Sequence, residues 1–205
     1  MTVTEPQVEP SKWTEIVRED PTHSHRYVER FRTMEAEGRD LAGEARLIDA
    51  LAPRAARVLD AGCGPGRVGA FLHSLGHTVV GVDVDPVLIV AANADHPGPT
   101  WIVADLAELS LAPDVAGDGF DVIVSAGNVV TFLAPSTRRA VLTNLRHSLR
   151  PEGRLVIGFG AGRDYPFDEF FEDVNAVGLT VDVRLSSWDG RPYDATSEFL
   201  VAILS

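Results

Sequence analysis

The stretch VLDAGCGPGR, residues 58–67, places three glycines at every second position directly after a short apolar run. Residues 57–61 have the aliphatic character of a buried strand, and the apolar residues between 68 and 75 recur at helical spacing. Glycine lets the backbone come close to a ligand, and the N–H groups at a helix N-terminus attract polar and anionic groups. The stretch therefore predicts a strand–loop–helix unit whose glycines approach a nucleotide-like cofactor and offer it N–H donors.

The alternation of short strands and amphipathic helices continues through most of the chain. Further strands are expected at residues 78–83, 101–104, 120–125 and 154–159, and helices at residues 24–38, 41–51, 68–75, 86–97, 141–149 and 167–177. A turn is expected at PEG, residues 151–153. This alternation is typical of an α/β protein in which a parallel sheet carries helices on both faces.

The end of the chain breaks this rhythm. Two expected strands, residues 179–187 and 197–204, follow one another with no helix between them. Only the segment 188–196, WDGRPYDAT, connects them, whereas a parallel crossover needs about a dozen residues or more. We therefore expect these two strands to pair antiparallel.

Composition narrows the classes of protein to which the chain belongs. A length of 205 residues with 45% hydrophobic residues fits a single globular domain. The net charge of −12 argues against nucleic acid as a partner. The chain has one cysteine, Cys63, and no apolar run that approaches the roughly 20 residues of a membrane helix. The N-terminus lacks the apolar core of a signal peptide, so we expect a cytoplasmic protein without a membrane partner.

The spacing of the glycines separates two classes of cofactor. A dinucleotide-binding loop has the pattern GxGxxG, and its third glycine would fall where Arg67 stands. The pattern here is GxGxG, formed by Gly62, Gly64 and Gly66, and Asp60 precedes it. The spacing therefore argues against a nicotinamide dinucleotide.

Two further acidic residues follow the next two expected strands. Asp83 ends the strand at 78–83 and can accept hydrogen bonds from both hydroxyls of a ribose. Asp105 follows the strand at 101–104 and can accept a hydrogen bond from an adenine amino group, while Val84 and Leu106 cover the faces of the ring. A nicotinamide site has a use for Asp83 but no evident need for Asp105.

Together these motifs resemble those of the class I S-adenosylmethionine (SAM)-dependent methyltransferases. VLDAGCGPGR is similar to their first motif, and VVGVDVD, VADL, FDVIVSAGNVVTFL and LRPEGRLVIGF are similar to the motifs that follow. The segments DPTHSHRYVERFR, GFGAGR and SSWDG resemble a bacterial subgroup of small methyltransferases. The resemblance implies a Rossmann-like α/β fold with a seven-stranded, mostly parallel sheet in the order 3-2-1-4-5-7-6, its last strand antiparallel.

The resemblance also implies a role for each motif residue. Asp60, Gly62, Cys63 and Gly64 would face the methionine part of SAM, Asp83 the ribose, Val84, Asp105 and Leu106 the adenine, and Ser125 the region of the transferred methyl group. The product would be S-adenosylhomocysteine (SAH). Cys63 is expected to be a small filler of the loop rather than a nucleophile.

Methyl transfer from a sulfonium needs little catalytic machinery. The methyl carbon is already electrophilic, so the enzyme mainly aligns the reactants and excludes water. A general base is needed only where the acceptor atom starts protonated. The candidates for contact with the acceptor are Asn128, His25 and Tyr27, and no metal is predicted because Ser125 stands where metal-dependent relatives carry an acid.

The segment before the motifs is expected to cover the cleft. We expect residues 1–40 to form an N-terminal arm and a lid helix, and residues 41–205 to form the methyltransferase domain, within one globular unit. The first twelve residues are expected to be loose. Arg30 and Arg163 are candidates for holding an anionic acceptor.

The leading hypothesis is in-line methyl transfer to an unidentified small molecule by a monomer or a homodimer. A protein that binds SAM without catalysis is a second hypothesis, and a nicotinamide-dependent reductase is a weaker third.

Overall fold

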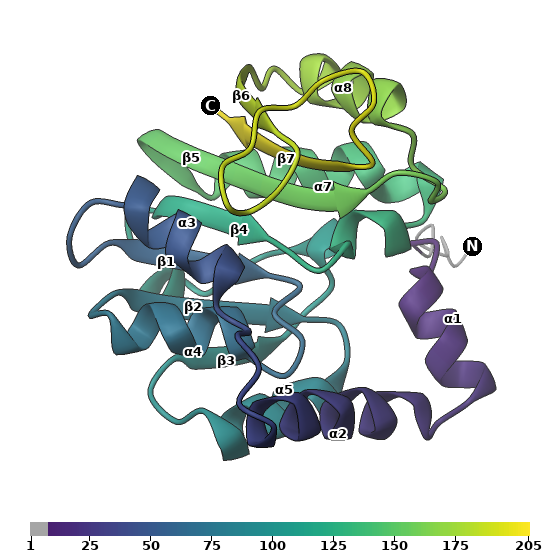
Figure 1. Ribbon diagram of the computed structural model, residues 1–205, viewed down its shortest axis with the longest axis vertical. Helices are drawn as coiled ribbons and strands as arrows, with labels where there is room; N and C mark the ends of the chain where they lie inside the picture. Colours follow the sequence, from purple (N-terminus) through teal and green to yellow (C-terminus); the bar gives the residue numbers. More distant parts are fainter. Residues whose placement is uncertain (1–7) are drawn as a thin grey trace, which may run out of the picture.

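The computed structural model describes residues 8–205 and contains a seven-stranded sheet in the order β3-β2-β1-β4-β5-β7-β6 (Figure 1). The pairs β1–β2, β1–β4, β2–β3 and β4–β5 are parallel, and β7 pairs antiparallel with both β5 and β6. The strands are β1 Arg57–Ala61, β2 Thr78–Asp83, β3 Thr100–Val103, β4 Phe120–Ser125, β5 Leu149–Gly160, β6 Val181–Leu185 and β7 Phe199–Leu204. This sheet confirms the expected fold and the antiparallel ending.

Helices cover both faces of the sheet. They are α1 Lys12–Glu19, α2 His23–Ala36, α3 Gly43–Leu51, α4 Arg67–Ser74, α5 Pro86–Asp95, α6 Pro113–Ala116, α7 Arg138–His147 and α8 Phe167–Ala176. Three short 3-10 turns complete them: η1 Leu106–Glu108, η2 Val129–Phe132 and η3 Pro135–Thr137.

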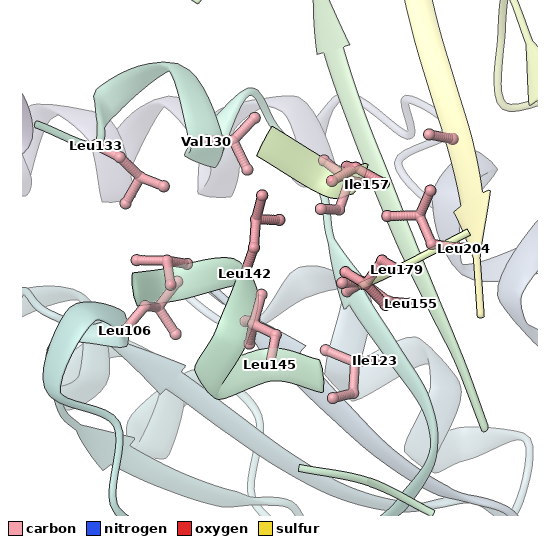
Figure 2. Packing of buried hydrophobic residues seen from close by; sticks show 14 of the residues in the cluster. Leu106, Ile123, Val130, Leu133, Leu142, Leu145, Leu155, Ile157, Leu179 and Leu204 are labelled. Atoms are coloured by element: carbon pink, nitrogen blue, oxygen red, sulfur yellow. The ribbon is translucent and has the colours of Figure 1, made fainter. Parts of the chain in front are cut away.

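The two faces of the sheet build separate cores, because successive side chains of a strand point to opposite sides. Leu59, Ile123 and Leu155 contribute to the larger core, into which α7 sends Leu142 and Leu145 (Figure 2). Their neighbours Val58, Val122 and Val156 face the other side, where α3 and α4 pack. Burial on both faces explains why these strands read as continuous apolar runs.

The N-terminal part differs from the expectation in one respect. The loose segment was expected to last to residue 12, but α1 begins at Lys12, capped by the Ser11 side chain, which accepts a hydrogen bond from the Thr14 backbone N–H. Residues 1–7 lie outside the described part. In Figure 1, α1 lies at the right, beyond the carboxyl ends of the parallel strands, and α2 runs beside α5.

The expected turn at residues 151–153 is also different. These residues belong to β5, which begins at Leu149 and contains an irregularity where Phe120 pairs with Leu149 and Val122 pairs with Arg154. Glu152 has a φ of 69°, in the left-handed region. The segment therefore bends as a turn does, while still pairing with β4 at both ends.

Candidate active site

A cleft lies at the carboxyl ends of the parallel strands and encloses about 990 Å³, a volume that includes its opening to solvent. Its walls come from the glycine loop, the ends of β2, β3 and β4, and the helices α1 and α2. The lining residues are Ser11, Trp13, Tyr27, Phe31, Asp60, Gly62, Cys63, Gly64, Pro65, Arg67, Val68, Asp83, Val84, Leu88, Ala104, Asp105, Leu106, Ala126, Gly127, Val129, Phe132 and Leu133.

The glycine loop needs glycine for its backbone conformation. Gly62, Gly64 and Gly66 have φ values of 81°, 55° and 91°, a region that other residues enter at a cost. A Cβ atom at Gly62 would lie 2.5 Å from the Val129 side chain, whereas one at Gly64 would meet only Tyr27, at 3.8 Å. The loop is thus bare toward the cleft and tightly packed behind it.

The expectation that the glycine N–H groups are available to a ligand is wrong for this conformation. The N–H groups of Gly62 and Cys63 both donate to the carbonyl of Val82, at 2.8 and 3.0 Å. The Gly64 N–H donates to Asp83 Oδ2 at 2.8 Å. The loop therefore contributes close approach rather than free donors, and its N–H groups attach it to β2.

Asp60 lies beneath the loop and is almost fully buried, with 2% exposure. Its Oδ2 accepts a hydrogen bond from the Gly69 N–H at 2.9 Å, which ties the end of β1 to the first turn of α4. Burial raises the pKa of the Asp60 carboxyl to about 7, because the charged form loses its hydration. Near neutral pH, the protonated and ionised forms of this carboxyl are therefore present in similar amounts.

Asp83 ends β2 at the wall of the cleft. Its Oδ1 accepts a hydrogen bond from the Asp85 N–H at 2.9 Å, in addition to the bond from Gly64. Burial raises the pKa of Asp83 to about 6, and the two backbone hydrogen bonds oppose that rise. The carboxylate is thus held in a fixed orientation at the edge of the cleft.

Asp105 occupies the corresponding position after β3. Its Oδ1 accepts from the Ala107 N–H at 2.8 Å and caps η1, which leaves Oδ2 without a bond in the described structure. Asp60, Asp83 and Asp105, from three neighbouring strands, therefore all line one cleft, together with Val84 and Leu106.

An aromatic wall from the N-terminal helices faces the acids. Trp13 makes edge contacts with Tyr27 and Phe132, at ring-centre distances of 5.1 and 5.8 Å, and Tyr27 contacts Phe31 at 5.0 Å. Such edge-to-face packing is a favourable arrangement of aromatic rings. Burial raises the pKa of the Tyr27 hydroxyl above its ordinary value, so this group is neutral at physiological pH.

The remaining predicted site residues lie farther from the cleft. Ser125 is buried behind its wall, and its Oγ has no hydrogen-bond partner among residues 8–205. Asn128, with a φ of 67°, uses its side-chain oxygen to accept from the Gly160 N–H at 2.8 Å. His25 is exposed on α2 and does not line the cleft. This conformation gives no support to His25 as a base, and Asn128 serves as a brace between β4 and β5.

Charged groups that face the cleft are mostly acidic. Arg67 lines it, but its guanidinium is bound to both carboxylate oxygens of Glu44, at 2.7 and 2.6 Å. Arg30 and Arg163, the candidates for holding an anion, are exposed and do not line the cleft. In the described conformation the cleft therefore presents no uncommitted basic side chain to an anionic acceptor.

Cys63 is buried in the loop. Burial and the neighbouring carboxylate of Asp60 raise the pKa of its thiol well above the usual value. A protonated thiol is a poor nucleophile, so this environment fits a filler of the loop.

Several lining residues were not singled out by sequence reasoning. Leu88 lies in an apolar helical segment, and Val129, Phe132 and Leu133 lie in the stretch FDVIVSAGNVVTFL, whose resemblance to a family motif gave these three residues no individual role. Arg67 was noticed as an interruption of the glycine pattern, while its ion pair with Glu44 joins segments 23 positions apart. An ion pair between residues this far apart leaves no pattern in the local sequence.

Within residues 8–205, no group of three or more His, Cys, Asp or Glu side chains is arranged to hold a metal ion. No helix in the described part is both long and apolar enough to cross a membrane.

Comparisons with known proteins agree with this geometry. A family model described as a methyltransferase domain matches residues 58–153. A crystal structure of a TehB-like SAM-dependent methyltransferase from Corynebacterium glutamicum is 48% identical, has a TM-score of 0.86, and the match covers 91% of this chain and 99% of that one.

Two curated proteins match over shorter regions. A probable SAM-dependent methyltransferase of Mycobacterium tuberculosis is 32% identical over 142 residues, which are 63% of this chain and 48% of that protein. A malonyl-[acyl-carrier protein] O-methyltransferase of Enterobacter lignolyticus is 32% identical over 105 residues, which are 51% of this chain and 39% of that protein. The chain spans about half or less of the length of these curated relatives.

The seven-stranded sheet in the order β3-β2-β1-β4-β5-β7-β6 is the Rossmann-like fold of the class I methyltransferases. The chain belongs to the SAM-dependent methyltransferase family, whose cofactor is SAM. The expected family, fold and cofactor are thereby confirmed, and the nicotinamide-dependent alternative is set aside.

Proposed function

We propose that this protein transfers the methyl group of SAM to a small, uncharged acceptor held between the N-terminal helices and the end of β4. The observation that carries the proposal is the composition of the cleft, in which the aromatic side chains of Trp13, Tyr27 and Phe31 face Asp60, Asp83 and Asp105. One wall offers hydrogen-bond acceptors to a nucleoside, and the other offers apolar surface that excludes water.

The residues present fit SAM. In this proposal Asp83 accepts hydrogen bonds from the ribose hydroxyls, Asp105 accepts one from the adenine amino group, and Val84 and Leu106 cover the ring; all four residues line the cleft. A Cβ atom at Gly64 would meet only Tyr27, at 3.8 Å, and the N–H that Gly64 gives to Asp83 fixes the orientation of that carboxylate. SAM, when bound, supplies an electrophilic methyl group on a sulfonium centre.

The chain's own contribution is alignment and desolvation. Asp60 and the bare loop position the methionine end, and the aromatic wall keeps water away from the reacting carbon. Tyr27, neutral and directed at the loop, is the residue we assign to contact with the acceptor. We assign Ser125, Asn128 and His25 no direct contact in this conformation.

The charge of the cleft narrows the acceptor. Arg67 is committed to Glu44, so an acceptor carboxylate or phosphate would find no partner charge there. An amine, thiol, phenol or heterocycle in its neutral form meets the aromatic wall without that cost. We further propose a cytoplasmic monomer or homodimer without a metal cofactor, in which residues 1–40 form the arm and lid of the domain at 41–205.

The first experiment measures cofactor binding. SAH should bind the purified protein in calorimetry and raise its melting temperature by mass action, whereas NADH should do neither. If SAH binds, the turnover of SAM is measured against a panel of neutral amines, thiols and phenols. Malonyl-[acyl-carrier protein] is added as an anionic acceptor, the anionic arm of the experiment, because one relative is named for it. Binding of NADH without SAH would contradict the proposal. Turnover of the anionic arm alone would overturn the acceptor class.

A further inference from the structure

Asp85, at the start of α5, holds the N-terminal helices as well as its own helix. The residue is buried, with 4% exposure. Its Oδ1 accepts from the Val87 N–H at 2.8 Å and caps α5. Its Oδ2 accepts from Trp13 Nε1 at 2.8 Å and also from the Ser24 hydroxyl. One oxygen therefore serves α5, and the other joins α1 and α2.

The two donors sit where the N-terminal segment turns around the cleft. Trp13 lies on α1 and lines the cleft, while Ser24 lies on α2 and is fully buried. Val28, one turn further along α2, packs against Leu88 and Ala91 of α5. This apolar contact sets α2 against α5, so the carboxylate of Asp85 meets Ser24 in a fixed position.

Asp85 is also connected to the ribose-facing acid. Its backbone N–H donates to Asp83 Oδ1 at 2.9 Å, and Asp83 Oδ2 accepts from the Gly64 N–H at 2.8 Å. A continuous chain of hydrogen bonds therefore runs from Trp13 and Ser24, through Asp85 and Asp83, to the glycine loop. Such chains are able to couple the order of two segments when each member is satisfied by the next.

We propose that Asp85 is a positioning residue that latches α1 and α2 over the cleft and so slows the release of the cofactor. The inference rests on the proposed function for the identity of the bound cofactor. The attachment of α1 and α2 by Asp85 does not depend on that function. Capping of α5 needs only Oδ1, and a serine would supply that bond. The two donors on Oδ2 come from segments 61 and 72 positions away and have no part in the cap.

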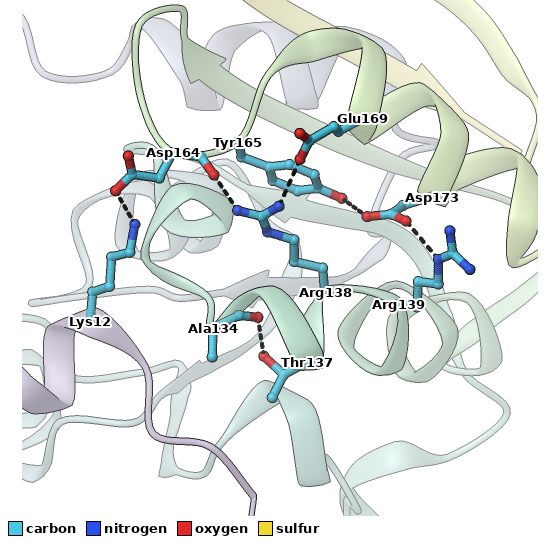
Figure 3. Close-up of polar contacts among 9 residues, drawn as sticks. All are labelled: Lys12, Ala134, Thr137, Arg138, Arg139, Asp164, Tyr165, Glu169 and Asp173. Carbon is cyan, nitrogen blue, oxygen red and sulfur yellow. Dashed lines mark hydrogen bonds and ion pairs between the residues drawn. The ribbon is translucent and has the colours of Figure 1, made fainter.

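A second attachment of α1 supplies the control. Lys12 forms an ion pair with Asp164 in the loop after β5, beside the Arg138–Tyr165 cluster (Figure 3). The Asp164 side chain is 80% exposed, and exposed ion pairs contribute little. Lys12→Gln therefore perturbs the same helix without touching Asp85.

The test compares three variants with the wild type. Asp85→Ser keeps a cap for α5 and removes the link to α1 and α2. Trp13→Phe keeps an aromatic ring and removes one donor, so it decides the question if Asp85→Ser does not fold. Two quantities are measured: the dissociation rate of SAH by stopped-flow displacement, and the rate of tryptic cleavage after Arg18 and Arg26 with and without SAH.

We expect SAH dissociation to be at least about tenfold faster in Asp85→Ser, because the oxygen that accepts from both Trp13 and Ser24 is lost and one hydrogen bond to a charged group already corresponds to about tenfold. Trp13→Phe should shift in the same direction by less, and Lys12→Gln should stay within twofold of the wild type. Cleavage in α1 and α2 should accelerate in Asp85→Ser even without SAH. If Asp85 acted only as a cap of α5, Asp85→Ser would lower the melting temperature. The rates of SAH dissociation and of tryptic cleavage would then rise only as far as the lower global stability explains.

Wild-type dissociation and cleavage rates in both Asp85→Ser and Trp13→Phe would overturn the latch. If wild-type protein binds no SAH, the proposed function fails, and the cleavage rates of the unliganded proteins still decide whether Asp85 holds the helices. The two hypotheses therefore fail through different measurements.

Discussion

At the scale of single residues, Asp83 has a structural role in addition to its expected one. The sequence indicates a ribose-binding role for this strand-end acid and carries no signal of a structural one. Both of its oxygens, however, accept backbone N–H groups, from Gly64 and Asp85, and the side chain is mostly buried. Removing the carboxylate therefore leaves buried donors unsatisfied, which costs about 1–3 kcal/mol per group.

Asp83→Ala should accordingly weaken SAH binding and also lower stability. Loss of a charged acceptor for the ribose corresponds to about 1.5–3 kcal/mol, or roughly one to two decades in Kd. Calorimetry measures the first effect and urea denaturation the second. Asp40→Ala, which removes an exposed acid paired with Arg46, should leave Kd within twofold. An unchanged Kd in Asp83→Ala would show that the ribose binds elsewhere.

Asp60 and Asp83 make the unliganded protein more stable in mild acid. Their pKa values in the folded protein are about 7 and about 6, against about 3.9 in an unfolded chain. Between these limits the folded state retains protons that the unfolded state has released. The free energy of unfolding therefore falls as pH rises from about 4 to about 7. Urea denaturation at pH 5.5 and 7.5 should give the higher stability at pH 5.5.

Binding of SAH should show the opposite dependence on pH. A ribose needs the ionised form of Asp83, and one unit below a pKa of about 6 only about a tenth of that form is present. Kd should be about tenfold higher at pH 5 than at pH 8, by calorimetry. Asp83→Asn should flatten this profile, and a profile unchanged in Asp83→Asn would assign the dependence to another group.

At the scale of elements, the sequence predicts β1, β2 and β4 with their observed ends. Their runs of Val, Ile and Leu are bounded by glycine or acidic residues, so pattern and boundary agree. The helix α1 was not predicted, even though its apolar residues Trp13, Ile16 and Val17 recur at helical spacing. Its position depends on distant partners, Asp85 and Asp164, which no local periodicity reveals.

Gly81 illustrates a constraint that arises only from pairing. It lies in β2 opposite Trp101 of β3, and the indole ring covers it. A Cβ atom there would come within 2.2 Å of the ring and 3.1 Å of Cys63 Sγ. The pattern VVGVDVD predicts the strand but does not explain its glycine.

Gly81→Ala should destabilise the protein by about 1–3 kcal/mol, the usual range for overpacking a core. The ring cannot move without losing its hydrogen bond from Trp101 Nε1 to the His96 carbonyl, at 2.9 Å. Urea denaturation measures the change. Gly43→Ala, at the start of α3, adds a methyl group whose nearest neighbour lies 3.9 Å away, and it should be neutral or slightly stabilising. Equal stability of the two variants would contradict the packing argument.

At the scale of the whole molecule, the cofactor half of the cleft is more predictable than the acceptor half. The acids and glycines stand at strand ends, and parallel strands bring their carboxyl ends to one edge of the sheet. The aromatic wall instead depends on how α1 and α2 return to that edge. Tyr27 was a candidate by residue type, but its contact with Trp13 is a product of tertiary packing.

Deleting residues 1–38 tests how far these two parts are separable. Among the described residues 8–38 none belongs to the sheet, and the cores formed by α3, α4, α7 and α8 remain complete. Deletion does expose Leu88 and Ala91, which pack against Val28, and it leaves Asp85 without two of its donors. We expect a folded protein with a lower melting temperature, weaker SAH binding and no methyl transfer. Circular dichroism, calorimetry and turnover measure these three properties.

Unfolding of the truncated chain would show that α1 and α2 are part of the core rather than a cover. Full turnover would show that the acceptor is held elsewhere, because the truncated cleft retains the three acids and loses the entire aromatic wall contributed by α1 and α2.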